Sequence, residues 1–488
     1  MLPPLIQRPR RRAAYRRRER GVTLALVALA IFSIVAMAGL SIDVGTLYQA
    51  KAEAQTAADA AALTAARMIS ISGVTGDPTN GASDGSWGDV CGGTSSPATL
   101  AAINVAQQNL ISGIAVPTAN VLVNYGGGSG GASSPNCGSL GGTSFGVNPV
   151  VAVTVTSARL PIFFARVFSL LPNGNFANAT ASATATAEVF NSSNSGTVVS
   201  SLIPVAPRCV KPLIVPNIDP TNGGAFIRIT DGSIVNPGVL PLGRGVIGES
   251  FTLTADCQHG QPNCEVGQHM IANPPQSNYP TLPPTLQYIP ALISGTPGAV
   301  PSCATGSLSN DSDYQPAIGG CDQSTVYACG TQLGAQADLT ENPVNPHSLN
   351  GDTGTALQCL IHAAAQGAGN GQDQLNTATY PFQIQAGSDN PLVKDGLVSN
   401  NGIITTSSSI VTMPIYDNGL GAQLARVPQP PVTIVGFLQL FIQYLDGNGH
   451  PYVTVLNVAG CGNGQTTTVS SSPVFGTSPV PVRLITPP

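Results

Sequence analysis

The 488-residue sequence has few charged side chains and few aromatic ones. Asp, Glu, Lys and Arg make up 9% of the chain, and Phe, Trp and Tyr make up 5%, with a single tryptophan, Trp87. Ordinary soluble proteins carry about 25% charged residues, so this composition argues against a cytosolic enzyme. A protein that binds surfaces or glycans should present clustered aromatics, and their scarcity argues against that class as well. The 55 glycines and 41 prolines instead favour a β-rich, long-looped protein outside the cytoplasm.

Motifs for catalysis and metal binding are also scarce. H-E-x-x-H and Walker A patterns are absent and no nucleophile–base pair is visible, so we expect no enzyme activity and no small-molecule substrate. Cys257, His259, Cys264 and His269 are of types that suit zinc. In an exported chain, two cysteines at this spacing more often form a disulfide, and we expect no metal and no cofactor. Residues 446–450 resemble part of a calcium loop, lack its later Glu, and predict a hairpin turn.

Charge of one sign is concentrated at the N-terminus. The first 20 residues hold eight arginines and one glutamate, a net charge of +7, whereas the other 468 hold 11 basic and 23 acidic residues, a net charge of −12. A basic arm can bind nucleic acid, but an apolar run begins at Val22 and would hold this arm against a membrane. We therefore expect membrane lipid, and no nucleic acid, as a partner.

The apolar run covers residues 22–42 and contains no charge. As a helix, its 21 residues span about 30 Å, the thickness of a bilayer core. The positive-inside rule would keep residues 1–21 in the cytoplasm and export the rest of the chain. Residues 48–68 are rich in Ala, Gln, Glu and Lys without Gly or Pro, so we expect one helix from about Val22 to Ser70.

Two kinds of N-terminal processing are alternatives to a retained anchor. Ala36, Met37 and Ala38 before Gly39 fit a signal-peptide cleavage rule, but the apolar run continues four residues further and the basic region is long. A prepilin-type site at Gly21 would need a Glu where Leu26 stands. We therefore expect the helix to be a retained anchor.

Four patterns follow one another in this region: Arg20–Gly21, the apolar helix, G-x-x-x-D-x-G-x-x-Y at 39–48, and Q-x-A-A-D-A-A-A-L at 55–63. Together they resemble the N-terminal region of TadG-like proteins of the Tad (tight adherence) machinery, which assembles Flp pili. The resemblance covers about 50 residues. The motif residues are Gly21, Gly39, Asp43, Gly45, Tyr48, Gln55, Ala58, Asp59 and Ala60. Asp43 is either an interfacial carboxylate that ends the span or a contact to a partner helix.

The resemblance implies a single-pass protein of the bacterial inner (cytoplasmic) membrane, with a cytoplasmic N-terminus and most of the chain outside the cytoplasm. It would be a structural or accessory component of Flp pilus assembly or anchoring, with other pilus-assembly proteins as partners. The alternative is a membrane-tethered adhesion or binding protein that shares only the Tad-like anchor.

We expect an α+β fold in which the transmembrane helix at 22–42 continues into a pilin-like helix-on-sheet domain. The expected regions are a cytoplasmic basic segment at 1–21, a TadE/TadG-like domain at 43–190, a linker at 191–201 and a loop-rich, disulfide-containing, mostly β domain at 202–488. Helices are predicted at 97–110, 159–171 and 353–367, and strands at 121–125, 148–156, 178–189, 225–230, 410–414, 432–445, 452–458 and 480–485. Nine prolines between 261 and 301 argue against regular central strands there.

The ten cysteines divide into two and eight. Cys91 and Cys137 precede a long gap, and we expect them to form a disulfide, because disulfides persist outside the cytoplasm. The other eight allow 105 pairings, among which the sequence does not choose.

Overall fold

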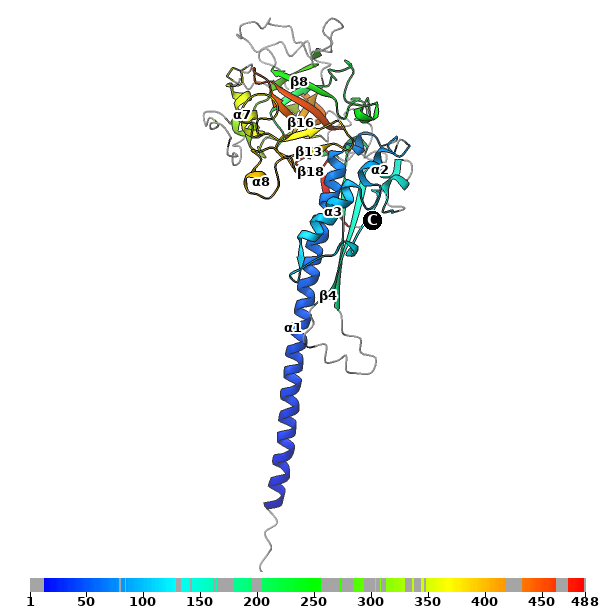
Figure 1. Ribbon diagram of the computed structural model, residues 1–488, viewed down its shortest axis with the longest axis vertical. Coiled ribbons are helices and arrows are strands. Elements are labelled where there is room, and N and C mark those ends of the chain that lie inside the picture. Colours follow the sequence, from blue (N-terminus) through cyan, green and yellow to red (C-terminus); the bar gives the residue numbers. More distant parts are fainter. Residues whose placement is uncertain are drawn as a thin grey trace, which may run out of the picture. The chain divides into compact units, whose positions relative to one another are not determined.

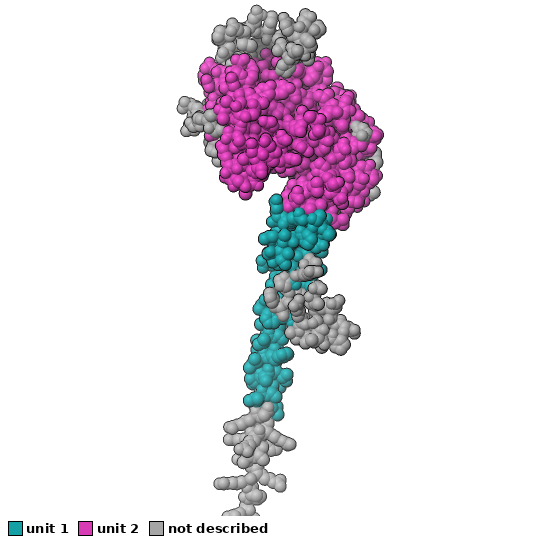
Figure 2. All heavy atoms as spheres, viewed as in Figure 1, with its two compact units in different colours: residues 1–58, 106–121, 154–184 teal, residues 59–105, 122–153, 185–488 magenta. Residues whose placement is uncertain are grey.

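The computed structural model describes residues 13–486 apart from several segments, of which the longest are 165–178, 195–203, 256–271, 274–283, 294–302, 418–431 and 462–472. Chain contacts divide the protein into two compact units. The first unit holds residues 1–58, 106–121 and 154–184, and the second holds 59–105, 122–153 and 185–488 (Figure 2). The domain limits expected from the sequence remain a prediction.

Helix α1, Ala13–Ile71, is the longest element and is blue in Figure 1. The prediction of one helix through the apolar run and the alanine-rich segment is confirmed. Among the described residues, one helix, starting at Val22, is long and apolar enough to cross a membrane. Further along α1, alanines 50, 54, 57, 58, 61, 62, 65 and 66 are fully buried. Their spacing of three or four residues places them on one face of the helix.

A four-stranded sheet has the strand order β19–β5–β4–β3. These strands are β3 Val121–Gly127, β4 Pro149–Leu160, β5 Ala179–Val189 and β19 Val482–Ile485. β19 pairs antiparallel with β5, so the last strand of the chain joins a sheet formed some 300 residues earlier. On β5 the alanines at 181, 183, 185 and 187 are buried and alternate with Thr and Ser, the pattern of a strand with one covered face.

The predictions for this region are mostly confirmed. α3, Pro97–Gln108, is the expected helix, and the strands expected at 121–125, 148–156 and 178–189 are present. β4 extends to Leu160, into the segment predicted as a helix at 159–171. The rest of that predicted helix lies outside the described residues except for Phe164, which forms a bend.

A ring of six strands closes on itself in the second unit. Hydrogen bonding runs from β16 through β15, β7, β10 and β8 to β17, and β17 pairs again with β16. The strands are β7 Leu213–Pro216, β8 Ser250–Ala255, β10 Thr285–Pro290, β15 Ile410–Tyr416, β16 Val432–Leu445 and β17 Pro451–Gly460. β9 Ala272–Asn273 pairs with β10, and β11 Gln336–Ala337 pairs with β16. Closure leaves no free edge in the ring, which removes a site for unwanted strand pairing.

The strongest strand prediction, at 432–445, corresponds to β16, a buried central strand of the ring. The expected turn at 446–450 is confirmed: Asp446 Oδ1 accepts the backbone N–H groups of Asn448 and His450 at 2.8 and 2.9 Å. The expected helix near 353–367 is α7, Asp352–Leu360.

Two predictions were wrong. Residues 225–230 form no strand: Ile227 makes only an isolated antiparallel bridge with Ile234. On its other side the Asn217 side chain replaces a strand partner, since Asn217 Oδ1 accepts the Ile227 N–H at 2.9 Å and Nδ2 donates to its carbonyl at 2.7 Å. The prolines between 261 and 301 do not prevent a central strand, since β10 has partners on both sides. Pro284 precedes β10 and Pro290 ends it, so no proline interrupts its interior.

Four disulfides join described residues. They are Cys91–Cys137, Cys209–Cys321, Cys303–Cys359 and Cys329–Cys461. Cys257 and Cys264 lie outside the described residues. Three of the four disulfides lie after residue 202, where long connections join the strands.

The remaining described elements are short. They are η1 Val74–Gly76, α2 Ser86–Cys91, β1 Leu110–Ile111, β2 Ile114–Ala115, η2 Thr118–Asn120, η3 Cys137–Ser139, α4 Thr143–Gly146, β6 Val205–Pro207, η5 Leu240–Leu242, α6 Tyr314–Gly319, β12 Gln374–Asn376, β13 Gln383–Gln385, α8 Pro391–Lys394, β14 Ile403–Ile404 and β18 Val474–Gly476.

A buried hydrogen-bonded group, which we call the Asn457 network, connects the end of α1 to the ring. It consists of Ser70, Gln439, Asn457, Ser478 and Val480. Asn457 Nδ2 donates to the Ser70 carbonyl at 2.6 Å and to Gln439 Oε1 at 2.7 Å. Gln439 Nε2 donates to Ser478 Oγ at 2.7 Å, and Ser70 Oγ donates to the Val480 carbonyl at 3.0 Å. All five residues are at least 98% buried, so these bonds satisfy groups that water cannot reach.

The segment that follows α1 makes similar contacts. Asn191, fully buried at the start of the predicted linker, donates through Nδ2 to Thr75 Oγ1 and to the Val458 carbonyl, both at 3.1 Å. Asp77 forms an ion pair with Arg244 at 2.6 Å. The end of α1 and the turn after it are therefore built into the larger unit.

The Asn457→Ala variant is expected to lower the free energy of unfolding by about 2–4 kcal/mol, because buried Gln439 Oε1 loses its donor and the Ser70 carbonyl keeps only the long 3.5 Å bond from the Gly73 N–H. Urea unfolding of the detergent-solubilised full chain, followed by Trp87 fluorescence, measures the change. Asn448→Ala, at an exposed turn position of the same hairpin, is the matched control and should change stability by less than about 0.5 kcal/mol. Equal losses for both variants would contradict a structural role for the network.

Candidate functional site

The nine motif residues are distributed along α1 from Gly21 to Ala60. Gly39, Asp43 and Ala58 are buried, whereas Gly45 and Tyr48 are exposed, Tyr48 by 73%. Asp59 and Ala60 are half-buried, and the exposed Gln55 donates through Nε2 to the Thr184 carbonyl on β5 at 3.4 Å. The motif therefore has residues that contact the rest of the chain and residues that face outward.

Gly39 and Asp43 form a notch on α1 that holds Phe164. The two residues lie one helical turn apart on the same face. The backbone N–H of Phe164 donates to Asp43 Oδ2 at 2.9 Å, and Asp43 is 2% exposed. A Cβ atom placed on Gly39 would lie 2.7 Å from Cγ of the Phe164 ring. A residue without a side chain is required for this close approach.

Glu53, almost three turns beyond Asp43 along α1, holds the β1–β2 hairpin. Its Oε2 accepts the backbone N–H of Ser112 at 2.6 Å, and its Oε1 accepts a bond from Gln49 at 2.9 Å. The Ser112 bond, followed by the Gln49 bond, lowers the pKa of the Glu53 carboxyl. Sequence reasoning missed this residue, because Glu53 and Ser112 are 59 positions apart and no local pattern connects them.

Gly45 and Tyr48 are exposed, unlike Gly39 and Asp43, which contact another segment of the chain. Among the described residues, a Cβ atom on Gly45 would meet nothing within 4 Å, so packing against them does not require a glycine there. A glycine inside a helix costs about 1 kcal/mol relative to alanine. Small residues on an outward face let another helix approach closely.

These motif residues all lie in a segment that a family model recognises. Residues 21–68 match the Tad model, described as putative Flp pilus-assembly TadE/G-like. No curated protein and no solved structure matches the chain. We call residues 21–68 the Tad region; it contains the notch, the outward pair Gly45 and Tyr48, and Glu53.

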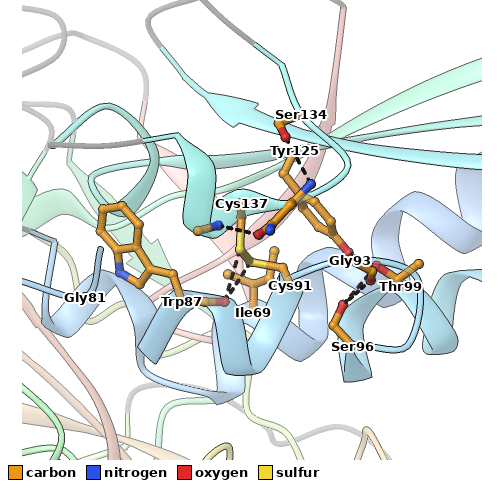
Figure 3. Close-up of a disulfide and its surroundings, with 12 residues drawn as sticks. Ile69, Gly81, Trp87, Cys91, Gly93, Ser96, Thr99, Tyr125, Ser134 and Cys137 are labelled. Atoms are coloured by element: carbon orange, nitrogen blue, oxygen red, sulfur yellow. Dashed lines mark hydrogen bonds between the residues drawn. A yellow bond between two sulfur atoms is a disulfide. The ribbon is translucent and has the colours of Figure 1, made fainter. Parts of the chain in front are cut away.

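The single tryptophan is a core residue (Figure 3). Trp87 is fully buried, and its ring meets Phe145 edge-on with centroids 5.3 Å apart. The Cys91–Cys137 disulfide lies directly beside its backbone carbonyl. Close by, the Tyr125 hydroxyl is 2.7 Å from Thr99 Oγ1, and burial raises the pKa of Tyr125 to about 12. Trp87 is therefore not available to stack on a ligand.

No catalytic arrangement is found among the described residues. The G-x-S-x-G spacing occurs at 81–85, 127–131 and 142–146. A nucleophile elbow requires a strand that leads into the motif, and no described strand leads into the first or the third. The second follows β3, but its serine lies outside the described residues. Ser83 Oγ instead donates to the Asn80 carbonyl at 2.8 Å. Lys211, whose burial lowers its pKa to about 7, is 4% exposed and donates to the Gly320 carbonyl at 2.6 Å. It is inaccessible to a substrate.

The described part of the chain also holds no group of three or more His, Cys, Asp or Glu side chains arranged to bind a metal. The zinc candidate Cys257, His259, Cys264 and His269 lies outside that part. A hollow of about 100 Å³ is lined by glycine backbone and by uncharged side chains including Gln374, Ser388, Asn400 and Asn401. Ligand pockets usually measure about 300–1,000 Å³, so this hollow is too small for an oligosaccharide.

Asp219 and Glu249 form a buried carboxyl pair in the larger unit, 2% and 6% exposed. Thr221 Oγ1 lies 2.7 Å from Asp219 Oδ1 and 2.8 Å from Glu249 Oε2. One hydroxyl has one hydrogen to donate, so a protonated carboxyl satisfies the group best. Burial, and next the charge of Asp219, raise the pKa of Glu249 from 4.5 to about 7.

Because of this carboxyl pair, we expect the free energy of unfolding to fall as the pH rises. The folded chain holds the Glu249 proton more tightly than the unfolded chain, so stabilisation is complete below about pH 4.5 and is lost as pH rises through about 7. Glu249→Gln keeps an uncharged side chain at every pH. It should therefore unfold at higher urea than the native chain at pH 8, by up to about 3 kcal/mol, and the difference should shrink towards pH 5. Asp395→Asn, the same charge removal at an exposed site, is the control; a pH-independent effect of Glu249→Gln would refute the assignment.

Proposed function

We propose that this chain is a single-pass inner-membrane protein that acts as a structural component of Flp pilus assembly. In this proposal α1 spans the membrane at residues 22–42, the arginine-rich segment stays in the cytoplasm, and the TadE/TadG-like region 43–190 and β-rich region 202–488 are exported. The Tad match supports the role. The net charge of +7 before an uncharged, exposed apolar run supports the orientation, and the four disulfides support export.

The observation that carries the proposal is the outward pair Gly45 and Tyr48. Both belong to the Tad region, yet both are exposed, and in the part of the chain that the structure describes nothing packs against the Gly45 position. An exposed glycine that weakens its own helix is explained when a second helix packs against it. We infer that this face of α1 contacts another membrane component of the pilus machinery.

The helix-on-sheet arrangement is part of the same proposal. The buried alanine face of α1 would pack on the small side chains of β5, as in pilin-like folds. The bond from Gln55 to the Thr184 carbonyl and the burial of Ala181 and Ala183 support this arrangement. It would leave the opposite face of α1 open to a partner.

A tethered adhesion protein is the second candidate. It would need a ligand-binding surface, but the tryptophan is buried and the polar hollow is small. Among the described residues we find no observation that favours it over an assembly role.

The test is complementation of cells that lack this chain, with pili counted by electron microscopy and attachment measured to a surface. Truncation near residue 200 would be a poor test, because it removes β19 from β5 and breaks the Asn457 network. Full-length point variants are therefore preferred.

Gly45→Leu should abolish or strongly reduce pili while the chain accumulates normally in the membrane fraction, because the new side chain clashes only with a partner. Ala119→Leu, which adds a side chain at an exposed position of the same compact unit but outside α1, is the control and should restore normal pili. Normal pili with Gly45→Leu would reject the contact. Normal pili but weak attachment in the deletion strain would favour the adhesion candidate.

A further inference from the structure

Phe164 lies beside the end of the apolar run. Its backbone N–H is bonded to Asp43, one residue beyond the run, and its ring contacts Gly39, which is inside the run. A membrane that covers residues 22–42 would therefore have its polar–apolar boundary at the height of Phe164. The residue is separated from Asp43 by 121 positions in the sequence, so α1 brings a distant segment to this level.

The notch explains how a carboxylate is accommodated at that boundary. A carboxylate at the edge of the hydrocarbon layer is costly unless it is hydrogen-bonded. Asp43 is 2% exposed, and the Phe164 N–H supplies a bond to it. The Phe164 side chain remains 45% exposed, so the notch fixes its backbone while part of the ring faces outward.

The surrounding sequence has the chemistry of an interfacial segment. Residues 159–171 contain eight Leu, Ile, Phe and Val residues, two arginines and no acidic residue. Apolar side chains with basic neighbours favour the boundary layer of a membrane with anionic head groups. Aromatic rings are enriched at the same level.

We propose that Phe164 is a second membrane contact of this protein, held in the interfacial layer of the lipid bilayer by the notch formed by Gly39 and Asp43. The proposal rests on the placement of α1 in a bilayer made under the proposed function. It assigns Gly39 and Asp43 a positioning role inside the chain, distinct from the outward pair Gly45 and Tyr48.

The experiment uses the full chain in nanodiscs made with either ordinary lipids or lipids brominated on their acyl chains, which quench tryptophan. Trp87 provides a constant background, which is measured in the native chain and subtracted. Phe164→Trp should lose emission about twofold in brominated lipid, as expected for an interfacial ring. Phe32→Trp, in the exposed middle of the apolar run, is the positive control.

Ile114→Trp is the matched negative control. Ile114 belongs to the same compact unit and is 53% exposed. It lies two residues after Ser112, whose backbone N–H is bonded to Glu53. Glu53 is ten residues, or about 15 Å, along α1 from Asp43. Its emission should not change with brominated lipid.

A second pair of variants tests the notch. In the Phe164→Trp background, Gly39→Leu should displace the ring and abolish quenching, whereas Gly45→Leu, the same substitution in open space, should leave it intact. Quenching that survives Gly39→Leu would overturn the role of the notch. Quenching of Phe32→Trp without quenching of Phe164→Trp would overturn the lipid contact and indicate a protein contact instead. If neither residue is quenched, the membrane placement of α1 itself fails.

Discussion

The buried amide of Asn457 is the constraint on which the larger unit depends. Its one side chain satisfies the last turn of α1 and a glutamine of β16, and that glutamine in turn bonds Ser478 just before β19. These groups come from positions 70, 439, 457 and 478, so the short bond to the Ser70 carbonyl forms only when β17 is in place beside the end of the helix. A buried hydrogen bond in a region of low dielectric is strong, and losing one partner is costly, which ties the end of α1 to the C-terminal strands.

The strands of the ring also pair with partners that lie far away in the sequence. The six-stranded ring contains two parallel pairs, β15 with β7 and β10 with β8, and parallel neighbours need long connections. Those connections carry most of the disulfides, which limit the entropy of an otherwise loose chain. A sequence with only 9% charged residues gains little stability from ion pairs. The closed ring of strands, the disulfides and the buried hydrogen bonds stabilise this protein instead.

The sequence predicts those elements whose residue pattern lies within one continuous segment, and it does not predict contacts between distant segments. α1 and β16 have long uninterrupted patterns, and both were predicted well. Ring closure, the pairing of β19 with β5 and the Glu53–Ser112 bond join residues far apart, and periodicity carries no information about them. The strand expected at 225–230 is absent for a related reason. Ile227 pairs with Ile234 in a single bridge, and its own N–H and carbonyl are bonded by the side chain of Asn217, ten positions away, so the pairing does not extend into a strand.

The Tad motif itself separates two kinds of contact by helical geometry. At about 100° per residue, Gly39 and Asp43 lie about 40° apart, whereas Gly45 and Tyr48 lie on the far side of α1. The first pair is buried against Phe164 and the second is open. The two glycines of this short pattern therefore have different roles. Gly39 is required by its contact with Phe164, whereas no described residue of this chain requires a glycine at position 45. A family pattern read as a single unit would hide this difference, and only the three-dimensional structure assigns each residue to the inside or the outside of the protein.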